Sequence, residues 1–201
     1  KGYNIVEKEE LVSIASYYDT TINILNYLLQ LNHETSLNRK KENERFLTES
    51  GINFDDDNKR VALKYIFVNS NAMLIYGAAG TGKTTLIKYI SNMFADARKL
   101  YLTKTHTALQ NVKRYLDNKS NNCDFEIIDS ITRSNLSVNY DIIFVDECST
   151  IDNRTMALLL GKISREVLLV MSGDIYQIES IDFGNWFFYA KEIVKIGRAH
   201  V

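Results

Sequence analysis

The amino-acid sequence predicts an α/β protein in which helices flank a central parallel sheet, preceded by a helical N-terminal segment. Two observations lead to this expectation. From Ala72 onward, short apolar runs alternate with segments that repeat apolar residues at helical spacing. A glycine-rich loop, residues 77–84, separates the first of these runs from the first of these helices. Short apolar strands separated by helices indicate a parallel sheet that is covered on both faces.

The N-terminal part, residues 11 to about 50, is expected to be helical. Its charged run at residues 39–45 is expected to be a solvated helix face, and residues 51–53 break the pattern. Residues 55–57, all Asp, would start a further helix through residue 67, because carboxylates cap and stabilise helix starts. Apolar side chains gather on one side of the first helices: Ile22, Ile24, Leu25, Leu28, Leu29 and Leu31.

In the alternating region, we expect strands at residues 72–76, 99–102, 125–128, 141–145 and 167–171, and helices at residues 83–94, 108–116 and 153–163. Ligands of such sheets bind outside the carboxyl ends of the strands, which is where the glycine-rich loop falls. We expect the chain to divide into a helical segment, residues 1–50, and an α/β domain, residues 51–195.

Composition excludes several classes of protein. The chain has 201 residues, a length sufficient for one substantial core. Its net charge of -1 does not by itself indicate a nucleic-acid-binding protein. Cys123 and Cys148, with three histidines, are too few for a disulfide framework or a zinc site, so we expect both to be buried or half-buried. We find no membrane-span or signal-peptide pattern, and we expect a cytoplasmic protein without a membrane partner.

The glycine-rich loop has the spacing of a phosphate-binding loop. Glycines let the backbone curl until its N–H groups point at phosphate oxygens, and the helix start adds the positive end of its dipole. Lys83 would then reach the β- and γ-phosphates of a nucleotide, and the Thr84 hydroxyl would hold Mg²⁺. The expected nucleotide-binding residues of this loop are Gly77, Ala78, Ala79, Gly80, Thr81, Gly82, Lys83, Thr84 and Thr85.

A second group of residues ends the apolar run at 141–145. Asp146 and Glu147 follow this run directly. Mg²⁺ prefers oxygen ligands and keeps several waters, so Asp146 can bind it beside Thr84. Glu147 would then be free to orient or deprotonate the attacking water.

A third group follows the run at 167–171, where Gly173, Asp174 and Gln177 stand in the pattern Gly-Asp-x-x-Gln. The order of the phosphate loop, Asp-Glu-Cys-Ser at residues 146–149 and this pattern resembles the first motor domain of superfamily-one helicases, especially the RecD-like branch. The resemblance implies a RecA-like P-loop NTPase fold, with ATP and Mg²⁺ as cofactors. It also implies that Gln177 contacts the γ-phosphate as a catalytic residue with Lys83 and Glu147, and that Asp174 belongs to the nucleotide site.

The same resemblance places a turn that lines single-stranded DNA at residues 102–109, with Lys104, Thr105, His106 and Ala108 as its nucleic-acid-binding residues. His106 and Thr107 differ from the residues usual there. A helix N-cap without a ligand is the open alternative, since Thr107 is also a suitable cap.

Two further positions follow from the family pattern or from composition. Asn58 stands where such helicases have a glutamine that recognises adenine, and because it is one methylene shorter, the resemblance implies a weaker or water-mediated contact with adenine and less strict selectivity for ATP over GTP. The aromatic run at residues 186–188, Trp-Phe-Phe, is expected to be core, with stacking on a base as the alternative.

The sequence is therefore identified as resembling the N-terminal motor domain of a RecD-like, ATP-hydrolysing helicase or translocase that acts on single-stranded DNA. In that family, a second motor domain, absent here, supplies arginines to the ATP site, so we expect this fragment to bind Mg-ATP but hydrolyse it slowly. An ATP-controlled switch or scaffold ATPase and a PhoH-like ATPase with an RNA partner are the alternatives.

Residues 196–201 correspond to a common sequencing-library adapter translated in one frame. We expect them to be an assembly artefact rather than part of the fold.

Overall fold

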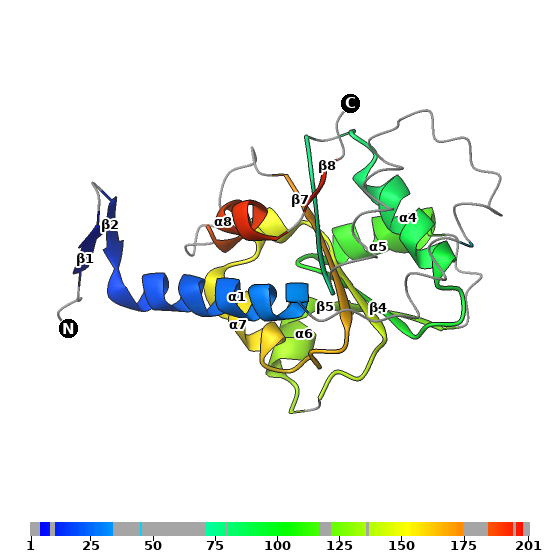
Figure 1. Ribbon diagram of the computed structural model, residues 1–201. Coiled ribbons are helices and arrows are strands. Elements are labelled where there is room, and N and C mark those ends of the chain that lie inside the picture. Colours follow the sequence, from blue (N-terminus) through cyan, green and yellow to red (C-terminus); the bar gives the residue numbers. More distant parts are fainter. Residues whose placement is uncertain are drawn as a thin grey trace.

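The computed structural model describes residues 5–8, 11–33, 45, 71–78, 80–116, 122–135, 137–174, 185–194 and 196–198. Its main body, shown in Figure 1, is built on a parallel sheet. The sheet has six strands in the order β5-β4-β6-β7-β3-β8. The strands are β3 (Ala72–Tyr76), β4 (Lys99–Thr103), β5 (Cys123–Ile127), β6 (Ile142–Val145), β7 (Leu168–Gly173) and β8 (Ile196–Arg198). This confirms the predicted α/β class.

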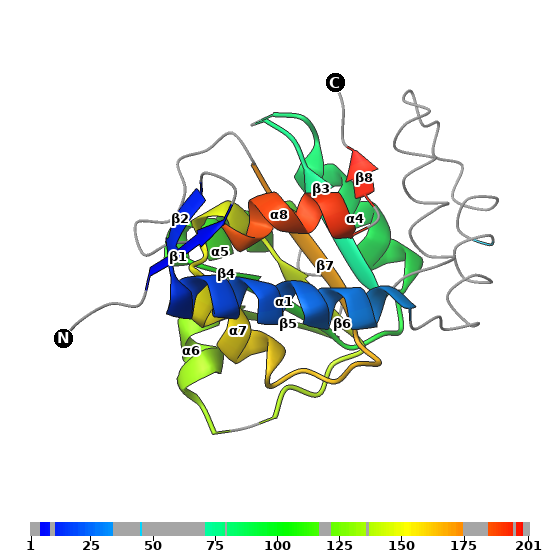
Figure 2. The same cartoon turned by 60° about the vertical axis from the view of Figure 1, so that its left-hand side comes forward.

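Helices cover both faces of the sheet, and the views in Figures 1 and 2 show the resulting three layers. On one face lie α4 (Lys83–Met93) and α5 (His106–Tyr115). On the other face lie α1 (Ala15–His33), α6 (Ile128–Arg133), α7 (Asn153–Leu160) and α8 (Trp186–Ile193). A short 3-10 turn, η1 (Cys148–Thr150), joins β6 to α7.

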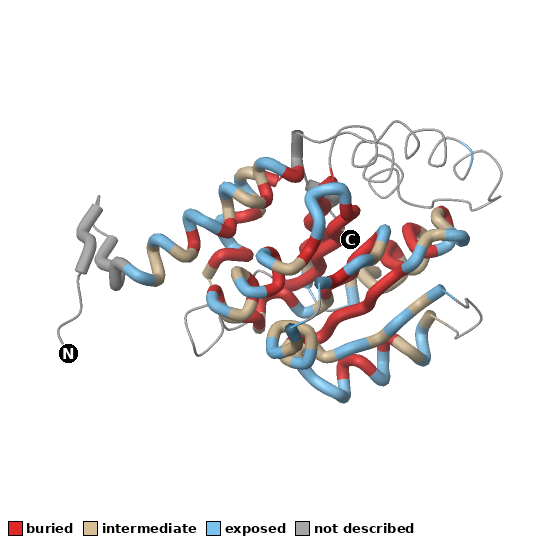
Figure 3. Tube along the Cα trace, turned by 90° about the horizontal axis from the view of Figure 1, so that it is seen from below, coloured by how far each residue is buried: buried red, intermediate tan, exposed pale blue. Residues whose placement is uncertain are grey.

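Residues of the inner strands β3, β4, β6 and β7 are buried along their whole length, as the continuous apolar runs predicted, whereas the residues of β5 alternate between half-buried and exposed (Figure 3). In β3, Leu74 packs in the core under α1, α7 and α8, whereas Met73 and Ile75 pack in the core under α4 and α5. The two cores follow directly from the alternation of side chains along a strand.

The N-terminal helix α1 is part of this body. Its Ile24, Leu28 and Leu31 are buried in the same core as one face of the sheet. A buried polar contact supports the packing, because the Asn153 side-chain amide donates to the Thr21 hydroxyl at 2.5 Å. The expected division at residue 50 lies outside the described residues and stays a prediction.

Residues 11–14, expected to be helical, are instead strand β2 (Leu11–Ile14), which pairs antiparallel with β1 (Ile5–Lys8). Val12 and Ile14 are β-branched, which favours a strand, and β1 provides the hydrogen-bonding partner that this strand needs. Pairing with β1 therefore explains why these residues form a strand and not a helix. Ile22 was expected on the buried side and is 37% exposed.

Other expected elements agree in kind with the structure and differ at their ends. Helix α5 begins at His106 rather than Ala108, α7 ends at Leu160 rather than at residue 163, and β7 continues to Gly173. Helices α6 and α8 were not predicted. The helix expected at residues 55–67 lies outside the described residues, as does the charged run at 39–45 except for Arg45.

Residues 196–198, which we expected to stand apart from the fold, form β8 beside β3. Backbone groups make this pairing, so it depends little on which side chains the segment carries. The proposed adapter origin of residues 196–201 stays a prediction. None of the helices that the structure describes is long and apolar enough to cross a bilayer.

Candidate functional site

The loop between β3 and α4 is shaped by two glycines with left-handed backbone conformations, Gly80 with φ 82° and Gly82 with φ 79°. Gly82 is the N-cap residue of α4 and has no side chain with which to cap it. The first backbone N–H groups of an α-helix lack partners within the helix. This helix start is therefore built to offer N–H donors to an anion.

Lys83 folds back over the loop. Its Nζ donates hydrogen bonds to the carbonyl oxygens of Gly77 at 2.7 Å and Ala78 at 2.8 Å. The Thr81 hydroxyl donates to the Ala78 carbonyl oxygen at 2.9 Å, which tightens the same turn. The ammonium group thus lies inside the loop, where phosphate oxygens could replace the two carbonyl oxygens as its acceptors.

The strand order brings the three sequence motifs to one edge of the sheet. Strand β7 lies between β3 and β6, so its carboxyl end separates the phosphate loop from Asp146. The Gly77 N–H donates to the Gly173 carbonyl oxygen at 3.3 Å, and the Ser172 hydroxyl donates to Asp146 Oδ1. Sequence reasoning missed Ser172; its signal was a hydroxyl at the end of an otherwise apolar strand.

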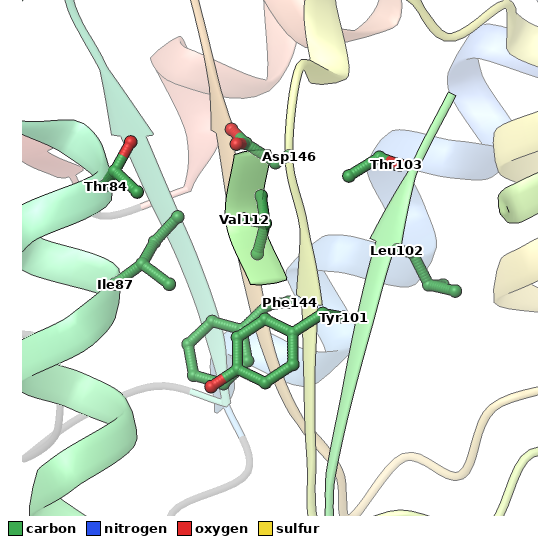
Figure 4. A pocket seen from close by; sticks show the side chains of 8 residues that line it. All are labelled: Thr84, Ile87, Tyr101, Leu102, Thr103, Val112, Phe144 and Asp146. Atoms are coloured by element: carbon green, nitrogen blue, oxygen red, sulfur yellow. The ribbon is translucent and has the colours of Figure 1, made fainter. Parts of the chain in front are cut away.

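Thr84 and Asp146 are among the residues around one small pocket whose lining is mostly apolar (Figure 4). The Thr84 hydroxyl and the Asp146 carboxylate lie at the same end of this pocket, and the rings of Tyr101 and Phe144 lie at the other. These oxygens suit Mg²⁺, which takes few protein ligands and completes its shell with waters and phosphates. Among the described residues, no group of three or more His, Cys, Asp or Glu could hold a metal on its own.

Glu147 has an unusual backbone. Its φ of 57° is in the left-handed region, which non-glycine residues seldom adopt and which occurs preferentially at functional sites. Its N–H donates to Asp146 Oδ1 at 2.9 Å. Lost hydration raises the pKa of the Glu147 carboxyl, and the neighbouring Asp146 charge raises it further. A carboxylate with a raised pKa is a stronger base than an ordinary one.

The turn after β4 is a capped helix start. The Thr105 hydroxyl accepts the Ala108 N–H at 3.2 Å, so Thr105, and not Thr107, is the N-cap of α5. The alternative cap at Thr107 is wrong because α5 starts two residues earlier than expected. His106 is exposed, whereas the Ala108 side chain is 7% exposed.

Lys104 contacts two carboxylates. Its Nζ lies 3.4 Å from Asp152 Oδ2 and 3.6 Å from Asp129 Oδ1. Burial tends to raise the pKa of Asp152, but hydrogen bonds from Thr155 and the Lys104 charge outweigh it, and the net pKa is lowered. The positive charge expected at this turn is thus partly neutralised by the protein itself.

The remaining predicted positions divide into described and undescribed ones. Asp174 follows β7 and is 8% exposed, whereas Asn58, Ala79 and Gln177 lie outside the described residues. Trp186 and Phe187 are buried core residues as expected.

Phe188 corrects the expectation that the whole aromatic run is core. It is 44% exposed, and the Lys191 Nζ lies 3.9 Å from its ring centroid. The reason is helical geometry, because three consecutive helix positions cannot all face one core. Cys148 is buried and Cys123 half-buried, as expected.

The fold and the loop define the class of the protein. The phosphate-binding loop follows the parallel strand β3, and Asp146 follows β6, which is separated from β3 in the sheet by β7 alone. This arrangement makes the chain a P-loop NTPase domain with a RecA-like fold. A model of the AAA domain family matches residues 56–195, and the chain belongs to that family.

Two curated relatives extend the comparison. The uncharacterized protein MJ1519 of Methanocaldococcus jannaschii is 27% identical over 223 residues, covering 92% of this chain and 19% of that protein. The RecBCD enzyme subunit RecD of Buchnera aphidicola is 22% identical over 212 residues, covering 90% of this chain and 34% of that protein. The resemblance to RecD-like helicases is thereby confirmed, and the chain spans about a fifth to a third of these relatives.

Among solved structures, the arterivirus nonstructural protein 10 (helicase) in complex with DNA is 15% identical, with a TM-score of 0.46. The match covers 59% of this chain and 34% of that one.

Proposed function

We propose that the chain is the ATP-binding and hydrolysing motor domain of a superfamily-one DNA helicase or translocase that acts on single-stranded DNA. The observation that carries the proposal is the meeting of the phosphate loop, Asp146 and Gly173 at the carboxyl edge of the sheet. The RecD relative supports the motor class.

ATP binds with its phosphates at the start of α4. The Lys83 ammonium exchanges the carbonyl oxygens of Gly77 and Ala78 for β- and γ-phosphate oxygens. Thr84 and Asp146 hold Mg²⁺, which supplies charge neutralisation to the phosphates. Asn58 contacts the adenine in this proposal.

Hydrolysis needs a water activated opposite the leaving group. Glu147 takes this role, because its raised pKa favours proton acceptance and its exposed side chain follows the strand that presents Asp146. Gln177 contacts the γ-phosphate, and Asp174 lies beside the same site. Arginines from a second motor domain complete the site, as in comparable phosphoryl-transfer enzymes.

Single-stranded DNA binds at the turn after β4. Thr105 and the exposed His106 provide contacts to the phosphate backbone, which position the strand without reading its sequence. Lys104 joins them by exchanging its carboxylate partners for phosphate oxygens. Ala108 takes part through its position in the turn, since its N–H already bonds to Thr105.

Fluorescence anisotropy with labelled oligo(dT) tests the nucleic-acid part of the proposal with this chain. We expect oligo(dT) to bind, with an affinity that falls as salt rises, because phosphate contacts release counterions. Oligo(rU) and a DNA hairpin are the comparison ligands. Absence of oligo(dT) binding at low salt would contradict the proposal, and tighter binding of oligo(rU) would favour the RNA-associated alternative.

Turnover separates a motor from a switch. In a longer protein that contains this chain together with the proposed second motor domain, we expect oligo(dT) to stimulate Mg-ATP hydrolysis and Lys83→Ala to abolish it. Equal turnover with and without nucleic acid would contradict the motor and favour the ATP-controlled switch.

A further inference from the structure

Helix α5 connects the turn after β4 to the phosphate loop. It begins at His106, capped by Thr105, and it ends at Tyr115. The Tyr115 hydroxyl lies 2.8 Å from Thr85 Oγ1 in the first turn of α4. Thr85 directly follows Thr84, whose side chain lines the pocket with Asp146. One helix of ten residues therefore touches both proposed ligand sites.

The contact of Tyr115 is supported by its neighbours. The Lys88 Nζ, one turn further along α4, lies 5.4 Å from the Tyr115 ring centroid, a distance at which a cation is attracted to an aromatic face. Val112, one turn earlier in α5, lines the same pocket as Thr84 and Asp146 (Figure 4). The end of α5 thus reaches the first turns of α4 through the Tyr115 side chain.

The Tyr115–Thr85 hydrogen bond can run in either direction. Tyr115 is 42% exposed, so water can satisfy the remaining hydrogen-bonding capacity of its hydroxyl whichever way the bond runs. A threonine hydroxyl has one proton to donate. When phosphate oxygens reach the start of α4, the Thr85 hydroxyl can donate its hydrogen bond to them and accept a hydrogen bond from the Tyr115 hydroxyl.

We infer that Tyr115 is a positioning residue, which orients the Thr85 hydroxyl toward bound phosphates and transmits nucleotide occupancy through α5 to the Thr105 turn. This inference rests on the proposed nucleotide site. Two sites joined in this way influence one another reciprocally. Nucleotide binding at α4 then stabilises the start of α5, where the Ala108 and Leu109 N–H groups bond to Thr105.

Hydrogen exchange on the 201-residue chain tests the inference. We expect saturating Mg-ADP to slow exchange of the Ala108 and Leu109 amides by about fivefold or more, the lower end of typical coupling between sites. In Tyr115→Phe, which keeps the ring over Lys88, we expect less than about twofold slowing. Tyr140→Phe is the matched control, because it removes another exposed tyrosine hydroxyl, bonded to Asp124 at 2.8 Å.

A second pair of variants separates positioning from a general structural role. Thr85→Val should lose the response of the α5 amides, and Thr85→Ser, which keeps the hydroxyl, should retain it. Titration calorimetry of each variant gives the Mg-ADP concentration that saturates it in the exchange experiment. Thermal unfolding without nucleotide checks that each variant folds.

The outcomes are distinguishable. If Mg-ADP binds the unmodified chain and leaves α5 exchange unchanged, or if Tyr115→Phe responds like the unmodified chain, the inference is wrong and the nucleotide site stands. If the folded, unmodified chain binds no Mg-ADP, the proposed nucleotide site is wrong and the inference falls with it.

Discussion

Single residues at the carboxyl ends of β6 and β7 carry much of the proposed chemistry. Asp146 is fixed by hydrogen bonds from the Ser172 hydroxyl and the Glu147 N–H. These bonds hold one carboxylate oxygen toward the protein. Glu147 shares the same short turn, but its side chain is exposed and its backbone is in the left-handed region. Two adjacent carboxylates thus have different surroundings, which suits different roles.

Glu147→Gln should stabilise the folded protein at neutral pH. The folded-state pKa of Glu147 is raised, first by lost hydration and then by Asp146, so folding disfavours its charged form. Stability is therefore lost as pH rises from the ordinary glutamate pKa through the raised one. Urea unfolding of both proteins between about pH 4 and pH 8 should show the advantage of the variant at neutral pH, shrinking toward acid. An advantage that grows toward acid would contradict the assigned direction.

Gly173→Ala should destabilise the protein. A Cβ at this position would lie 2.7 Å and 2.8 Å from two ring atoms of Phe187 and 3.1 Å from the Ser149 nitrogen. Overpacking of this kind typically costs about 1–3 kcal/mol. Urea unfolding measures the loss, and Gly173→Ala combined with Phe187→Leu should recover part of it. A single variant as stable as the unmodified chain would show that Phe187 is free to move.

Among the elements, α1 has the least obvious role from sequence and a clear one in the structure. Its buried side chains share the core of the parallel sheet, and its Thr21 bonds to Asn153 at the start of α7. Asp152, the neighbour of Asn153, caps α7 and contacts Lys104 near the proposed DNA turn. The N-terminal helix is thus a structural part of the same α/β body as the sheet.

Leu28→Ala should destabilise the whole body. Leu28 is 0% exposed, and removing a buried leucine side chain costs about 2–5 kcal/mol. Ile22→Ala on the same helix, where 37% of the residue is exposed, is the control and should cost less than about 1 kcal/mol. Urea unfolding followed by Trp186 fluorescence reports on the body. A Leu28→Ala transition equal to that of the unmodified chain would show that α1 is not part of the cooperative unit.

Across the whole molecule, sequence predicted what depends on local pattern. The strand at residues 72–76 was placed at its observed ends because a short apolar run is bounded by Asn71 and Gly77. The phosphate loop followed from its glycine spacing. The contacts of Lys104 with Asp129 and Asp152 could not be predicted, because they depend on which strands are neighbours in the sheet.

The contact between the Tyr115 and Thr85 hydroxyls could not be predicted for the same reason, because it depends on how α5 lies relative to α4. The start of α5 was missed because the Thr105 cap competes with Thr107, and only the backbone geometry distinguishes them. Local motifs can therefore be predicted from the sequence, whereas contacts between residues far apart in the sequence depend on the order of strands and helices in the fold.

Titration calorimetry of Mg-ATPγS with the 201-residue chain tests the central claim, that the phosphate loop is a nucleotide site. We expect one binding site that depends on Mg²⁺ and is lost in Lys83→Ala, while Lys191→Ala, which removes the same charge elsewhere, binds like the unmodified chain. No binding by the folded chain, or equal binding by Lys83→Ala, would contradict the account.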